Sequence, residues 1–333
     1  MNSTLRRHDR VKAAAEAFFG SAIEDMSFPG GEKRASVRLR VNGRSVIASL
    51  RPDYRRTHLE AFVLQKLHPF CDDVPECLGV EADVLFQADV GDRRLNQEIR
   101  AHSPAVQQAL AEEAVAAIFR IHAAARRTDL HDIMPHLGNN PGWLRSFVDA
   151  VDILEPLMER GIPARYPRDS LPDFLNRPAA QFVKWDCRAG NAALDEAGRL
   201  RWFDFEYAGI RHGAEDFAWL IGDESWPVDA ATMLDLVADG FDPACGHDLD
   251  DYMAYLTVYS TLHCVQRLKL ILEEVQRRGW RDAAEIVDRD DVGRHPDFAA
   301  QLCRNAAVLA DRHAYTAPLV PYFETAVDSF LSV

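Results

Sequence analysis

Three polar residues near the middle of the chain are of the types that handle phosphate groups and a metal ion. Asp186 and Asn191 share one polar loop, and Asp204 follows after a short hairpin. Phosphoryl transfer needs one carboxylate to orient a substrate hydroxyl, and oxygen ligands that hold Mg²⁺ against the phosphates of a nucleotide. The set therefore predicts Asp186 as a catalytic carboxylate, and Asn191 and Asp204 as metal ligands.

Short apolar segments must position these three residues. Residues 181–183 predict one strand, and residues 191–194 and 200–203 predict two more that are joined by a tight turn. Asp204 comes directly after the last of them. We therefore expect the Asp204 carboxylate, at the end of the strand at 200–203, to lie beside the loop that precedes the strand at 191–194.

The first 90 residues have the patterns of a small sheet with helices. We expect helices at 5–25 and 57–67, and strands at 35–41, 45–50 and 84–86. Asn42-Gly43 is a favoured two-residue hairpin turn. From Ser103 onward most of the pattern is helical. The sequence predicts an α+β fold with a small β-rich N-terminal lobe, residues 1–90, and a larger, mostly helical lobe, residues 91–333.

Composition excludes several classes of protein. The net charge of -14 argues against a nucleic-acid binder, because phosphate backbones bind clustered Lys and Arg. The sequence contains no run of about 18 apolar residues, so it predicts no membrane span. Its N-terminus also lacks the apolar segment of a signal peptide. The six cysteines form no Cys-x-x-Cys pair. We expect reduced thiols and a cytoplasmic protein, and the sequence leaves the oligomeric state open.

Charge is unevenly distributed along the chain. Between Lys33 and Lys66 there are nine basic residues and two acids, whereas between Gly213 and Gln266 there are eleven acids and no Lys or Arg. This suits a protein that binds an anion at one end and a cationic or polyhydroxyl partner at the other. Two solvated surfaces would give the same pattern.

The segment around the three polar residues resembles a known family. Phe182 to Asn191 (FVKWDCRAGN), Trp202 to Gly209 (WFDFEYAG) and Gly213 to Leu220 (GAEDFAWL) are similar to the catalytic stretch of the aminoglycoside phosphotransferase and choline kinase-like family. The resemblance implies a protein-kinase-like bilobal fold with ATP and Mg²⁺ as cofactors. It also implies that Asp216 is a buried aspartate that braces the catalytic loop.

Weaker similarity extends over the N-terminal part of the chain. Gly30 and Gly31 resemble the family's nucleotide-binding loop, and Glu60 resembles the helix glutamate that pairs with a strand lysine. Phe86 and Ala88 lie in a segment that resembles the hinge whose backbone binds adenine. The resemblance implies that ATP lies between the two lobes.

Two positions depart from the family pattern. The loop normally opens His-Gly-Asp, but here it is Lys184-Trp185-Asp186. A lysine beside a carboxylate can lower its pKa and pair with it, which would weaken it as a base. The strand lysine is also absent, and Ser49 or Arg51 falls nearest its position. Arg51 could hold phosphates and pair with the helix glutamate, whereas with Ser49 the contact would be missing.

The sequence thus predicts an ATP- and Mg²⁺-dependent phosphotransferase that acts on a hydroxyl of a small molecule. An aminoglycoside, a choline-like amine and a sugar all remain open as acceptors. The alternatives are a degenerate kinase-like protein that binds a nucleotide or metabolite with little or no transfer, or a different fold. Glu206 could line the acceptor pocket or make a structural bond.

Overall fold

The computed structural model describes residues 3–32, 34–158, 161–178 and 180–332. Lys33, in the segment that resembles a nucleotide-binding loop, lies outside the described residues.

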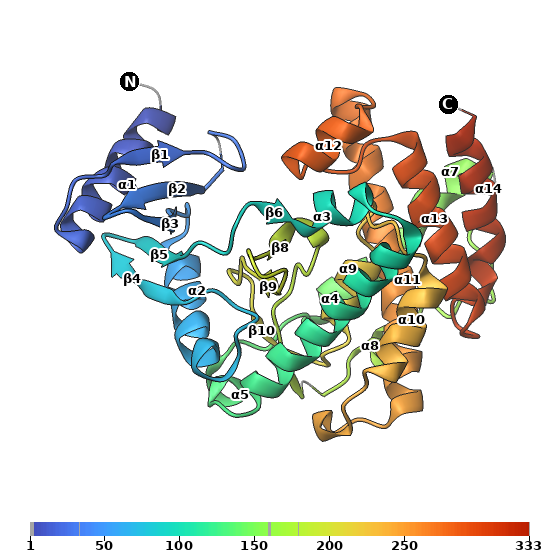
Figure 1. The fold of residues 1–333 in the computed structure, drawn as a ribbon. Coiled ribbons are helices and arrows are strands. Elements are labelled where there is room, and N and C mark those ends of the chain that lie inside the picture. Colours follow the sequence, from blue (N-terminus) through green and yellow to red (C-terminus); the bar gives the residue numbers. More distant parts are fainter. Residues whose placement is uncertain (1–2, 33, 159–160, 179, 333) are drawn as a thin grey trace.

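One end of the molecule is a five-stranded antiparallel sheet (Figure 1). Its strands, in the spatial order β1-β2-β3-β5-β4, are β1 (Asp25–Ser27), β2 (Ser36–Val41), β3 (Arg44–Ser49), β5 (Val84–Ala88) and β4 (Cys77–Glu81). The helices α1 (Ser3–Phe19) and α2 (Tyr54–Leu67) pack beside it. Alternating apolar residues of β2 and β3 face α1 and form a small core of their own. This confirms the predicted N-terminal sheet.

The hairpin between β2 and β3 follows the predicted turn chemistry. Asn42 and Gly43 have φ angles of 50° and 70°. Two consecutive positive φ angles define the turn whose twist matches that of paired strands, and Asn-Gly tolerates them best. The turn sets the register in which Ser36 pairs with Ser49.

Two smaller sheets lie next to the helical part. β7 (Gln181–Val183) pairs with β10 (Gly209–Arg211), and β6 (Arg93–Arg94), β8 (Ala192–Leu194) and β9 (Leu200–Trp202) form a three-stranded sheet. The predicted strands at 181–183, 191–194 and 200–203 are therefore present. The proposed division at residue 90 falls between β5 and β6.

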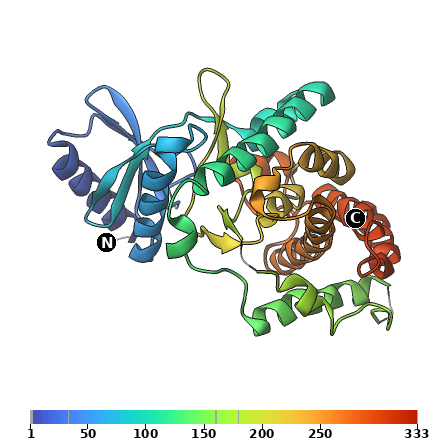
Figure 2. The same cartoon turned by 90° about the horizontal axis from the view of Figure 1, so that it is seen from below.

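The rest of the chain is mostly helical. The helices are α3 (Leu95–Glu98), α4 (Pro104–Ala125), α5 (Leu130–Ile133), α6 (Pro141–Asp149), α7 (Glu155–Met158), α8 (Leu171–Leu175), α9 (Glu215–Ile221), α10 (Ala230–Asp239), α11 (Leu249–Arg278), α12 (Ala283–Arg289), α13 (Pro296–Asp311) and α14 (Val320–Leu331). Both views show most of them gathered at the end of the molecule opposite the N-terminal sheet, while Figure 1 shows α5 near α2 and α4 crossing the middle (Figures 1 and 2). The long helix α11 is buried along much of its length and packs against α9 and α13.

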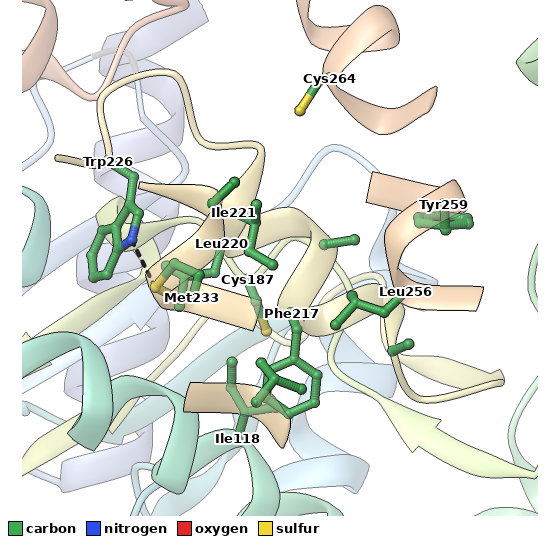
Figure 3. Packing of buried hydrophobic residues seen from close by; sticks show 14 of the residues in the cluster. Ile118, Cys187, Phe217, Leu220, Ile221, Trp226, Met233, Leu256, Tyr259 and Cys264 are labelled. Atoms are coloured by element: carbon green, nitrogen blue, oxygen red, sulfur yellow. Dashed lines mark hydrogen bonds between the residues drawn. The ribbon is translucent and has the colours of Figure 1, made fainter. Parts of the chain in front are cut away.

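The helical core reaches the loop that carries the predicted chemistry. Cys187, directly after Asp186, lies among Phe217 and Leu220 of α9 and Ile118 of α4 (Figure 3). The burial of Cys187 restricts the movement of the loop at this point, because close-packed interiors tolerate little displacement. Within the described residues, no helix is long and apolar enough to cross a membrane.

Candidate active site

The loop between β7 and β8, called the catalytic loop here after its predicted role, brings the first two predicted residues together. The side-chain amide of Asn191 donates to the Asp186 carboxylate at 3.0 Å and to its backbone carbonyl at 2.9 Å. Trp185, Asp186 and Asp204 all have positive φ angles, between 53° and 67°. Non-glycine residues adopt this conformation at a cost, and such strain gathers at functional sites.

Asp216, in the first turn of α9, holds the backbone of the catalytic loop. Its carboxylate accepts hydrogen bonds from the backbone amides of Lys184 and Trp185, both at 2.8 Å, and its Oδ2 lies 2.9 Å from Nε2 of His122. Asp216 is almost fully buried. Removing a buried carboxylate with several donors leaves those donors without partners, which makes this a strong constraint on the loop. The contact agrees with the bracing role that the resemblance implied.

Lys184 connects the two segments that carry the predicted ligands. Its side chain is buried, and Nζ lies 3.3 Å from the carbonyl oxygen of Asp186 and 3.1 Å from that of Asp204. The rings of Trp202 and Phe205 lie within cation-π distance of the ammonium group. The ammonium therefore bonds to backbone carbonyls in place of the Asp186 carboxylate with which the sequence suggested a pairing.

The carboxylate of Asp186 pairs instead with Arg188, two residues further along the loop. Nε of Arg188 lies 2.8 Å from Oδ1 of Asp186. Burial alone would raise the pKa of Asp186, but the charge and hydrogen bond of Arg188, together with the charges of Lys184 and Arg267, outweigh it and hold that pKa below its usual value. The expected lowering by Lys184 therefore acts through its charge, without a direct pairing. The sequence analysis did not single out Arg188; a cation two residues from the predicted catalytic acid was the available signal.

Arg51 joins the N-terminal sheet to the segment after β9. Its guanidinium lies 2.5 Å from the Glu60 carboxylate, 2.7 Å from that of Asp204 and 2.8 Å from that of Glu206. Burial would lower the pKa of Arg51, but the three carboxylates raise it above its ordinary value. A planar guanidinium can serve several carboxylates at once, which a lysine could not do in the same geometry.

This contact decides which residue pairs with the helix glutamate. Ser49 is the last residue of β3 and its hydroxyl lies 2.7 Å from that of Ser36, so Arg51 takes the contact with Glu60. Glu60 is buried and also accepts a hydrogen bond from the amide of Phe205 at 3.1 Å. Burial raises the pKa of Glu60 although Arg51 opposes the shift. The role of Arg51 and Glu60 in binding a nucleotide stays a prediction.

A cavity of about 270 Å³ lies between the sheet and the catalytic loop. Among the predicted residues, it is lined by Gly30, Arg51, Ala88, Asn191 and Asp204.

Four predicted residues are not among those that line the cavity: Gly31, Glu60, Phe86 and Asp186. Phe86 is fully buried, with its ring packed on Phe18 and Phe19 of α1, and its strand pairs on both sides. Asp186 is set back beside Asn191 and not on the wall itself. Gly31, with a φ angle of 90°, adopts a conformation that favours glycine.

Three further arginines line the cavity, and the sequence analysis did not single them out individually. They are Arg34, Arg38 and Arg94. Arg38 is fixed by Asp89, whose carboxylate lies 2.6 Å from its Nε. Together with Arg51 they supply cations for an anionic ligand. The same lining includes the carboxylates of Asp89, Asp92, Asp204, Glu206 and Asp290, so an anion binds there only if it displaces some of these groups or arrives with a cation such as Mg²⁺.

The donor set fits a magnesium ion held jointly with phosphate. The amide nitrogen of Asn191 is committed to Asp186, so its amide oxygen is the atom that could face a cation. Asp204 supplies a carboxylate on the same cavity wall. No cluster of three or more His, Cys, Asp or Glu with metal-binding geometry occurs within the described residues. Mg²⁺ does not require one, because it commonly binds one or two protein oxygens together with substrate phosphates and water.

The acidic stretch has mostly structural contacts. Glu215 pairs with Arg211 at 2.5 Å and Glu224 with Arg267 at 2.7 Å, and both acids are buried. Asp229, Asp242 and Asp248 accept amide hydrogen bonds at the starts of α10, of a short 3₁₀ turn and of α11. Most of these acids therefore make contacts within the protein and do not form the cation-attracting surface that the sequence suggested.

Comparison with known proteins identifies the class of fold. No protein-family model and no curated protein sequence matches the chain. Among solved structures, a choline/ethanolamine kinase family protein from Mesorhizobium loti is 14% identical with a TM-score of 0.54, and the match covers 97% of this chain and 99% of that one. Macrolide 2'-phosphotransferase MphH from Brachybacterium faecium is 15% identical with a TM-score of 0.52, covering 88% and 97%. The streptomycin–ATP–APH(2")-IIa ternary complex is 13% identical with a TM-score of 0.53, covering 83% and 94%.

These matches run over nearly the whole length of both chains. The protein therefore has the protein-kinase-like fold, with aminoglycoside phosphotransferases and choline kinases as its structural neighbours, as the motifs predicted. At these identities the likeness establishes the fold.

Proposed function

We propose that the protein is an ATP- and Mg²⁺-dependent phosphotransferase that moves the γ-phosphate to a hydroxyl of a small molecule. The observation that carries the proposal is the meeting of Asp186, Asn191 and Asp204 beside a cavity lined by arginines. The shared fold supports it, because one neighbour of that fold was solved with ATP and streptomycin.

Each residue has a role that its position allows. Asp186 would accept the hydrogen bond of the acceptor hydroxyl and orient it for in-line attack. The low pKa of Asp186 keeps it charged, so it acts mainly by orienting the hydroxyl and less as a strong base. When bound, Mg²⁺ would neutralise phosphate charge, and Asn191 and Asp204 are the residues that would hold it.

The nucleotide would lie between the sheet and the catalytic loop. Gly30 lies at the cavity wall next to the arginines and would cover the phosphates, while Arg51 would brace them. The backbone from Gln87 to Asp89, which lines the cavity, would contact the adenine, whereas that of Phe86 is paired within the sheet on both sides. We place ATP in this cavity because anionic oxygens and guanidinium groups make strong, charge-assisted hydrogen bonds.

The acceptor would be a small polyhydroxyl or amine-bearing compound. MphH is named for a macrolide and other neighbours were solved with streptomycin or hygromycin B.

The free thiols of all six cysteines fit a reducing cytoplasm, which is where we expect the protein to act.

The second candidate is a nucleotide-binding protein with little transfer activity. It is favoured by the pairing of both key carboxylates with arginines, Asp186 with Arg188 and Asp204 with Arg51. A magnesium ion would have to compete with Arg51 for Asp204, and an acceptor hydroxyl with Arg188 for Asp186. If this competition is lost, binding would occur without transfer.

The test separates binding from chemistry. Thermal unfolding with and without ATP and Mg²⁺ measures nucleotide binding, since a ligand of the folded state raises its stability. A panel of hydroxyl compounds is then screened for acceptor-dependent ADP release. Binding together with release that is lost in Asp186→Ala supports the phosphotransferase. Binding without release for any acceptor supports the second candidate, and the absence of binding contradicts both.

A further inference from the structure

A carboxylate from the far end of the chain lies in the cavity beside the arginines. Asp290, at the C-terminal end of α12, lines the same cavity as Gly30, Asn191 and Asp204. Its side chain is 11% exposed, and its Oδ1 lies 3.3 Å from Nη1 of Arg188. The carboxylate thus occupies a position among cations that would equally suit a phosphate group.

The C-terminal end of α12 also holds the glycine-rich loop, which is the segment before β2 that contains Gly30 and Gly31. Nη2 of Arg34 donates to the carbonyl oxygens of Arg289 at 2.8 Å and Asp290 at 2.7 Å. These carbonyls end α12, where a cation interacts favourably with the helix dipole. Figure 1 shows α12 facing the loop that precedes β2 across the space between the two ends of the molecule. A bridge therefore runs from the glycine-rich loop through Asp290 to the catalytic loop.

The catalytic loop is shaped to receive Asp290. A Cβ atom at Gly190 would collide with the Asp290 carboxylate, so any residue other than glycine would require the Asp290 side chain to shift. Asp290 itself has a φ angle of 47°, a left-handed conformation that costs energy for a non-glycine residue. The left-handed backbone ends α12 at this point, and the close approach to Gly190 places the Asp290 carboxylate against the catalytic loop.

The element that carries Asp290 is lightly anchored. Ile286 is the single buried side chain of α12, and Asn96 donates to the carbonyl of Val287 at 2.9 Å. Beyond Asp290 the chain is fixed again, because the buried Glu224 accepts the amide of Gly293 at 2.7 Å. Segments with few buried apolar contacts open at low free energy, so α12 can move while its downstream end stays in place.

We propose that Asp290 is an internal counter-ion that holds the glycine-rich loop closed when no nucleotide is bound, and that nucleotide phosphates replace it beside Arg34 and Arg188. The role rests on the proposed binding of ATP in this cavity. Asp290 competes with the phosphates for the two arginines and repels their charge. Nucleotide entry therefore requires α12 to withdraw, which couples binding at the cleft to the position of a helix from the opposite end of the sequence.

The main test is Asp290→Asn, which removes the charge and keeps the size, and asparagine tolerates the left-handed backbone. Its control is Asp288→Asn, an exposed acid on the same helix. ATP affinity is measured by titration calorimetry, with inorganic triphosphate as a probe that needs no adenine site. Amide hydrogen exchange of residues 28–36 is measured without nucleotide.

We expect Asp290→Asn to bind both probes about fivefold more tightly than wild type, the effect of losing one partly buried ion pair and its repulsion. Exchange in residues 28–36 should be faster than in wild type, and Asp288→Asn should match wild type in both measurements. Arg34→Gln should also speed exchange but weaken binding of both probes, because Arg34 serves the phosphates after Asp290 leaves.

Two results would overturn the inference. One is unchanged exchange in Asp290→Asn; the other is affinity for triphosphate that is equal to or weaker than that of wild type. If triphosphate behaves as expected but ATP does not bind, the counter-ion role stands and the proposed use of ATP fails.

Discussion

The two walls of the cleft are built in different ways. On the helical side, the catalytic loop is held by buried groups: Asp216 accepts two of its backbone amides, and Lys184 bonds to the carbonyls of Asp186 and Asp204. On the sheet side, the contact with Asp204 is made through one arginine, Arg51, and the glycine-rich loop is held through Arg34. The difference implies that the proposed catalytic carboxylate and metal ligand are fixed in advance, whereas we expect the wall that is proposed to bind phosphates to adjust when a nucleotide arrives.

The largest effect on activity should come from a change on the helical side of the cleft, where the side chains are held by buried groups. Asp186→Ala should lower acceptor-dependent ADP release by about 10²- to 10⁴-fold, the usual contribution of a positioned acid-base group. ATP affinity should change little, because Asp186 lies behind the cavity wall. Enzyme assays and calorimetry measure the two quantities. Glu196→Ala, in the exposed hairpin after β8, is the control and should keep wild-type rates. Normal turnover in Asp186→Ala would remove its assigned role.

The brace should be the next most sensitive point. Asp216→Asn places an amide NH₂ where a carboxylate accepts hydrogen bonds, so at least one buried donor loses its partner. We expect the free energy of unfolding to fall by about 3 kcal/mol. Urea denaturation measures it, with Asp235→Asn on the exposed side of α10 as the control. A loss below about 0.5 kcal/mol would show that the loop is not braced in this way.

Acid should weaken the helical side through its buried histidines. Burial lowers the pKa of His263 to about 3 and that of His212 to about 2. In the unfolded chain both bind a proton near pH 6.5, so stability falls as pH drops below that value. At pH 5 each should cost about 2 kcal/mol relative to pH 7. Urea denaturation at both pH values should show a smaller difference for His263→Gln, and an unchanged one for the exposed His131→Gln.

A change on the sheet side of the cleft should give the smallest effects on ATP affinity and stability. Arg51→Lys keeps the charge, but a lysine cannot bridge Glu60, Asp204 and Glu206 in one plane. We expect ATP affinity to fall by about fivefold and the unfolding free energy by about 1 kcal/mol. Calorimetry and urea denaturation measure these, and Arg55→Lys on the exposed start of α2 is the control. A loss as large as that of Asp216→Asn would mean that the two walls are equally fixed.

The parts of the site that the sequence predicted are those that local chemistry specifies. Asn191 and Asp186 share one loop, so their contact follows from a short segment. The Asn42-Gly43 turn and the short strands likewise follow from neighbouring residues. The partner of Glu60 remained open between Ser49 and Arg51, because these residues are two positions apart on the same side of an extended chain and only the position at which the strand ends separates them.

The parts that the sequence could not predict depend on contacts between distant residues. Arg34 and Asp290 are 256 positions apart, and nothing near either one indicates the other. The expected pairing of Lys184 with Asp186 failed because the β9 segment brings the carbonyl of Asp204 next to the ammonium. The acids after Gly213 were predicted either to attract a cationic partner or to form a solvated surface, but Glu215 and Glu224 meet buried arginines once the helices pack.

The buried Lys184 has a practical consequence for chemical labelling. Its amine is 1% exposed and surrounded by carbonyl oxygens and aromatic rings, so an amine-reactive reagent can reach it only when the catalytic loop opens. The modification rate of this one side chain would therefore count the opening events of the loop, while exposed lysines such as Lys12 react throughout. A peptide that contains Lys184 and stays unlabelled would show that the loop remains closed in solution.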